Sequence, residues 1–162
     1  MNKQTPTLTK QKTMANIFDK EANKSLLDRF EKLSDDTQPL WGKMTVSQMV
    51  LHCQKPLDVA LGKLILGGGL LGMLFGKMAK NSFLKNRRFS KNAPTAPQFK
   101  ISGVPDFEKE KSELLLMVTA FGNVGPDIIT NKKHPFFGVM TDEEWGILHY
   151  IHLDHHLKQF GL

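Results

Sequence analysis

TDEEWGILHYIHLDHHLKQFGL, residues 141–162, is the stretch that decides how the chain folds. Thr141 and Glu144 form a capping box, in which a hydroxyl and a carboxylate satisfy free amides at a helix start. Acidic residues fill the first turn, and a lysine and a glycine stand near the end, as the helix dipole and a helix stop favour. The pattern therefore predicts one helix that carries four of the six histidines.

These histidines do not all face the same way. At roughly 100° per residue, Trp145, His149, His152 and His156 share one stripe, whereas His155 lies off it. The spacing of His152 and His156 sets their Cβ atoms about 5 to 6 Å apart, so both rings can reach one divalent ion. Spacing alone fits a second interpretation equally well, in which the rings bond to carboxylates or water or lie at the solvent edge.

Length and composition indicate a single domain. A chain of 162 residues can bury one hydrophobic core. The segment 1–13, MNKQTPTLTKQKT, is polar and lacks the apolar core of a signal peptide. We therefore expect a disordered tail at 1–13, one domain at 14–162 and a cytoplasmic location. Cys53 is the only cysteine, which excludes an intramolecular disulfide and a cysteine-rich zinc site.

The basic charge does not predict a nucleic-acid-binding protein. The formal net charge is +6, and lysines and arginines gather between residues 77 and 100 with phenylalanines among them. No helix-turn-helix or RNA-binding signature accompanies them. We expect a solvated loop here, with a cradle for the phosphate or carboxylate of a small ligand as the alternative.

The most apolar stretch is 64–76, LILGGGLLGMLFG. It is too short to span a bilayer as a helix, which takes about 20 residues, and its glycines weaken a helix further. We expect a buried connector or a contact between two copies of the chain, and not a membrane anchor. A homodimer is the corresponding prediction.

Three more helices are expected, and together they predict an all-α fold, a four-helix bundle with long middle connections. Apolar residues at helical spacing place the first at about 17–33. Thr45 and Gln48 form a capping box that opens the second, and Asp106 caps a third that runs to about residue 121. The segment 134–138, HPFFG, is expected to be an aromatic turn.

The second helix carries one further histidine and the cysteine. Cys53 falls on the core-facing side, where it is expected to be an inert small hydrophobe. His52 falls on the flank, more than a right angle from the centre of that side, which is typical of a surface or edge histidine. Spacing alone therefore does not make His52 a ligand.

Several segments resemble one family: LWGKMTVSQMVLHC, NAPTAPQFKI, DFEKEK, HPFFG and HYIHLDHHLKQFG. From residue 14 onward the chain resembles the DinB-like superfamily of four-helix bundles, within it a branch described as domain of unknown function 1569. The superfamily's closing His-x-x-x-His-x-x-Gln motif is matched by His152, His156 and Gln159, and its helix-two histidine by His52. The resemblance implies that the three histidines hold a divalent ion, commonly zinc or nickel. A set with His149 in place of His152, and a bundle without metal, are the alternatives.

Two functions are compatible with this resemblance. The first is a metal-dependent transferase or hydrolase that acts on a small molecule, with a low-molecular-weight thiol or water as the nucleophile. Glu143, Glu144 and Gln159 are candidate partners of the ligand rings, whereas Asp154 points away from the histidine stripe and favours a surface ion pair. The second is a non-catalytic dimeric scaffold that pairs through 64–76 and in which any metal is structural.

Overall fold

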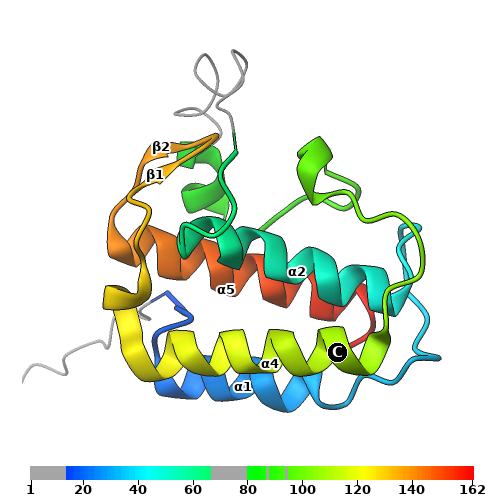
Figure 1. The fold of residues 1–162 in the computed structure, drawn as a ribbon. Helices are drawn as coiled ribbons and strands as arrows, with labels where there is room; N and C mark the ends of the chain where they lie inside the picture. Colours follow the sequence, from blue (N-terminus) through cyan, green and yellow to red (C-terminus); the bar gives the residue numbers. More distant parts are fainter. Residues whose placement is uncertain (1–13, 67–79, 87, 94) are drawn as a thin grey trace, which may run out of the picture.

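The protein is described by a computed structural model that covers residues 14–66, 80–86, 88–93 and 95–162. The described part is mostly helical, as the sequence predicts. Its four long helices are α1 (Lys20–Phe30), α2 (Val46–Ala60), α4 (Phe107–Val124) and α5 (Asp142–Gln159). Figure 1 shows them side by side, with α2 and α5 above α4 and α1. Both α1 and α2 contact α4 and α5, so the four helices enclose one core.

The predicted helix starts are confirmed at the level of single hydrogen bonds. The amide of Gln48 donates to the Thr45 hydroxyl at 3.2 Å, and the Thr45 amide donates to the Gln48 side chain at 3.1 Å. Thr141 and Glu144 make the same reciprocal pair at 3.1 and 2.9 Å. Asp106 accepts from the amide three residues on, at 3.0 Å. Since these bonds are local, the sequence alone locates the starts of α2, α4 and α5.

The first helix is shorter than predicted. α1 begins at Lys20 and ends at Phe30, although Ile17 and Leu33 on either side are buried. These two apolar residues reach the core from non-helical backbone, so the burial pattern extends beyond the helix. A periodic pattern reports which residues are buried and does not by itself report where a helix ends.

One prediction about the connections is wrong, and one is confirmed with an addition. Residues 80–86 are helical, where a solvated loop was expected. Phe83 of this helix is buried, and its ring stacks on Phe89 and Phe137. The aromatic turn at 134–138 is the tip of a hairpin, with β1 (Lys133–His134) antiparallel to β2 (Gly138–Val139). Two-residue strands are too short for an alternating pattern to reveal. Short 3₁₀ helices, η1 (Pro97–Phe99) and η2 (Gly125–Ile128), complete the described connections.

The core is built from apolar residues of all four long helices. Fully buried members include Leu26, Phe30, Met49, Leu57, Leu114, Phe121, Trp145, Leu153 and Leu157. Cys53 is buried among them as predicted, and burial raises the pKa of its thiol, so it is not a reactive thiolate. No helix among the described residues is long and apolar enough to cross a membrane. The predicted subunit contact at 64–76 falls outside the described residues from position 67 onward.

Candidate metal centre

Three histidine rings from two helices meet at one point. His52 projects from α2, and His152 and His156 project from α5 one helical turn apart. The Nε2 atoms of His52 and His152 are 3.2 Å apart. The centroid of the His156 ring lies 4.7 Å from the centroid of each of the other two rings. One nitrogen from each ring lies within 4.8 Å of the other two, so the group could hold a metal ion.

Packing of α2 against α5 buries His52, whose side chain is 4% exposed. The flank position that helical spacing gives this residue is covered by α5 in the structure. The edge interpretation of His52 is therefore wrong. His52, which the family resemblance identified as a ligand, faces the two histidines of α5.

Hydrogen bonds fix which nitrogen of two rings carries the hydrogen. His52 Nδ1 lies 2.9 Å from the carbonyl oxygen of Phe99, which can only accept, so Nδ1 donates. His156 Nδ1 donates to Gln159 Oε1 at 2.8 Å, and Gln159 Nε2 donates to the carbonyl of Trp41 at 2.8 Å. The second bond sets the orientation of the amide, because only its nitrogen can donate. Both neutral rings therefore present an unprotonated Nε2.

The donor set suits a divalent cation. With the Nε2 of His52 unprotonated, His152 supplies the N–H in their 3.2 Å contact. Two ligands of a tetrahedral zinc ion, each at about 2.0 to 2.1 Å, are separated by about 3.3 Å. The observed spacing of these two nitrogens is close to that value. Neutral imidazole nitrogens are common ligands of zinc and nickel, so the residues present fit such an ion.

Burial keeps these rings in the neutral form that binds metals. Desolvation is the largest cause that lowers the pKa of His52, of His152 and of His156, the last to about 3. Repulsion from the charged form of neighbouring histidines lowers the pKa of His152 and His156 further. At neutral pH the three rings therefore carry no positive charge that would repel a cation. To bind one through Nε2, His152 has only to move its hydrogen to Nδ1.

A cavity of about 730 Å³ opens onto the three rings. Its walls come from the segment between α1 and α2, from α2, from residues 89–93 and 95–101, and from α5. Its lining residues include Trp41, Lys43, Phe89, Phe99, Lys100 and His155. The volume lies in the range typical of small-molecule sites.

The two extra histidines of α5 have different surroundings. His149 is 1% exposed and its ring stacks on Trp145, with Phe121 at its edge. It belongs to the core and not to the group of three, so the structure does not bring it into the place of His152. His155 lines the cavity between Trp41 and Phe89 without being part of the group.

The acidic candidates lie away from the rings. Asp154 forms ion pairs with Arg29 at 2.8 Å and with Lys158 at 2.7 Å, as the sequence predicts. Glu144 caps α5 and pairs with Lys80 at 2.7 Å. Of the three candidate ring partners, only the glutamine contacts a ring.

Sequence reasoning missed the backbone groups that orient the rings, the carbonyls of Trp41 and Phe99. One signal for the first is Gly42, which has a φ of +85°. A Cβ at this position would lie 2.5 Å from the Nε2 atom of Gln159. The glycine therefore lets the loop carbonyl approach the glutamine that orients His156.

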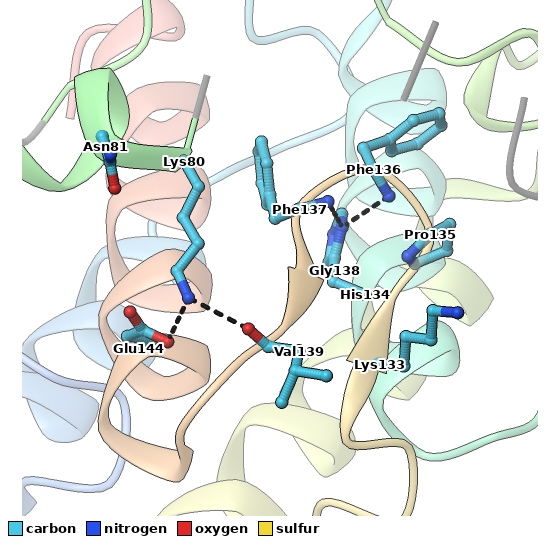
Figure 2. Close-up of a pocket in the computed structure, with 10 residues that line it drawn as sticks. All are labelled: Lys80, Asn81, Lys133, His134, Pro135, Phe136, Phe137, Gly138, Val139 and Glu144. Carbon is cyan, nitrogen blue, oxygen red and sulfur yellow. Dashed lines mark hydrogen bonds and ion pairs between the residues drawn. The ribbon is translucent and has the colours of Figure 1, made fainter. Parts of the chain in front are cut away.

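A second cavity, of about 440 Å³, lies beside the hairpin and the start of α5 (Figure 2). Several of its polar groups are already engaged in hydrogen bonds or ion pairs. Lys80 Nζ donates to the carbonyl of Val139 at 3.0 Å and pairs with Glu144 (Figure 2). His134 Nδ1 accepts from the amides of Phe136 and Phe137. The contacts of Lys80 tie the hairpin to α5, and those of His134 lie within the hairpin. These polar groups therefore have a structural role.

Comparisons with known proteins give one result. Neither curated proteins nor solved structures include a match to the chain. A family model described as "Protein of unknown function (DUF1569)" matches residues 18–161, a span that contains all three histidines of the group. The chain therefore belongs to the DUF1569 family.

Proposed function

We propose that this protein is a DinB-like four-helix bundle that binds one divalent metal ion, zinc or nickel, through His52, His152 and His156. The observation that carries the proposal is the meeting of three neutral imidazoles, two of them with Nε2 left free by hydrogen bonds at Nδ1. The pairwise packing of four helices and the position of Gln159 beside His156 support the DinB-like assignment.

We further propose that the site is catalytic, in a transferase or hydrolase that activates a low-molecular-weight thiol or water. Three histidine ligands leave coordination positions open, and a bound ion supplies Lewis acidity that lowers the pKa of a coordinated water or thiol. The chain's own part is to hold the rings and to offer a cavity in which a small-molecule substrate fits.

Elemental analysis of the purified protein tests the metal site. We expect about one divalent ion per chain in the wild type and a loss of nearly all of it in His152→Ala. His155→Ala is the matched control, because that histidine lies on the same helix and in the same cavity but outside the group. Metal content in His152→Ala equal to that of the control would rule out the proposed site.

A screen with thiol cosubstrates tests catalysis. The metal-loaded protein is offered electrophilic substrates with and without small thiols, and His152→Ala is run beside it. Turnover that needs both the thiol and the intact histidine supports a thiol transferase. Turnover with water alone supports a hydrolase.

A further inference from the structure

The cavity over the histidines contains no carboxylate. All sixteen acidic residues of the chain lie within its described part, and none of them lines this cavity. The three imidazoles are neutral and contribute no negative charge. A divalent cation at this place would keep its full charge in a partly desolvated site, which is costly unless an anion accompanies it. The compensating charge must therefore come from outside the chain, from a hydroxide or from an anionic ligand.

The same cavity is bordered by basic side chains. Lys43 and Lys100 line it, and both are exposed. The ion pairs found among the described residues involve neither of them. Lys91 adds a third ammonium group beside the rim, 4.4 Å from the centre of the Trp41 ring. These groups can meet an anionic group of a ligand in the cavity.

Aromatic rings form part of the remaining wall of the cavity. Trp41, Phe89 and Phe99 line the cavity, and the Phe89 and Phe99 rings contact His152 and His52 edge-on, with centroids 5.8 and 6.3 Å apart. Such walls favour an apolar or aromatic body over a fully polar molecule. The volume of about 730 Å³ also exceeds what a single inorganic anion would fill.

From these three features we propose that the site takes a small organic anion. One end would face the histidines, an apolar body would lie among the aromatic rings, and a carboxylate or phosphate at the other end would meet Lys43 and Lys100. This inference rests on the proposed metal site, and it names the class of substrate that such a site accepts.

Cobalt-loaded protein gives a binding test that does not depend on turnover. The probes are benzyl mercaptan, 4-(mercaptomethyl)benzoate and 4-(mercaptomethyl)phenylphosphonate, which share one thiol anchor and one ring and differ in the distal group. Cobalt–thiolate absorption reports the dissociation constant of each. We expect at least one charged probe to bind about five-fold more tightly than the neutral probe, and the preference to shrink at high salt. Comparison of the two charged probes distinguishes a carboxylate from a phosphate ligand.

Variants assign the preference to the two lysines. Lys43→Gln combined with Lys100→Gln should abolish it, whereas the corresponding arginine replacements should retain it. Lys109→Gln, on the exposed side of α4, is the control for a general change in charge. Dissociation constants that show no preference for the charged probes would overturn this inference and leave the metal site standing. A preference that survives the glutamine replacements would do the same. Failure to bind cobalt would overturn both.

Discussion

Gln159 fixes the tautomer of His156, because its oxygen accepts from Nδ1 while its nitrogen donates to the Trp41 carbonyl. Removal of the acceptor in Gln159→Leu leaves the ring free to place its hydrogen on Nε2. We expect the affinity for zinc to fall about 10- to 100-fold, the usual effect of losing such a partner. Competition with a chromophoric chelator measures this, and Gln159→Glu, which retains an acceptor, should lose less. Equal losses in both variants would argue against control of the tautomer.

We expect His149 to make folding sensitive to acid. Its ring is buried, its Nε2 atom has no hydrogen-bond partner, and burial lowers its pKa to about 3 from an ordinary value of 6.5. The unfolded chain therefore binds a proton between about pH 6.5 and 3 that the folded chain does not. The stability associated with the neutral ring is complete above pH 6.5 and is lost as the pH falls, at up to about 1.4 kcal/mol per pH unit.

His149→Phe should flatten this dependence, since the new ring fits the stack with Trp145 and Phe121 and does not titrate. Urea denaturation of the metal-free protein at pH 7, 6, 5 and 4 compares the variant with the wild type. The free energy of unfolding should decline less steeply with acid in the variant. Parallel curves would show that another group, such as His134, whose pKa burial lowers to about 4, accounts for the acid sensitivity.

At the scale of elements, stability and metal binding are separable along α5. Thr141 caps the start of the helix, whereas the two histidines of the group lie in its second half. Thr141→Ala should cost about 1 kcal/mol of stability by leaving helix amides without partners. The affinity for zinc should stay close to that of the wild type. Thermal denaturation and chelator competition measure the two quantities, and Thr141→Ser is the control that retains the cap.

In the loop between α1 and α2, by contrast, stability and metal binding should be coupled. Gly42→Ala would crowd Gln159 and strain a residue with positive φ. Because this glutamine orients His156, we expect a lower metal affinity in addition to a loss of stability of about 1 to 2 kcal/mol. Gly103→Ala also strains a positive φ but meets no atom within 4 Å. That control should lower stability alone, and an unchanged affinity in Gly42→Ala would contradict the role of the loop.

At the scale of the whole molecule, the core does not depend on the candidate site. Buried apolar residues from all four long helices pack together, and the histidine group occupies one junction between α2 and α5. Removal of metal with a chelator should therefore lower the melting temperature but leave the helical circular dichroism spectrum at 25 °C largely unchanged. A bound ion that stabilises only the folded state contributes about 3 to 4 kcal/mol at concentrations 100 to 1,000 times Kd. Complete unfolding on chelation would instead favour the scaffold in which the metal is structural.

The sequence by itself determined the local features of this protein. Capping boxes at Thr45 and Thr141 and the cap at Asp106 involve residues three apart, so they could be read directly and were found where predicted. The proximity of His152 and His156 follows from helix geometry alone. The family segments, and not spacing, pointed to His52.

Only the tertiary structure decided what each helix face meets. One stripe of α5 carries His149 into the core beside Phe121 and carries His152 toward His52, because different helices cover the stripe at different heights. The carbonyls that orient the rings, the helical segment 80–86 and the hairpin also depend on contacts between residues distant in the chain. Helical periodicity specifies a direction from an axis, whereas a metal site requires atoms from separate helices to coincide within a few ångströms, and packing alone brings that about.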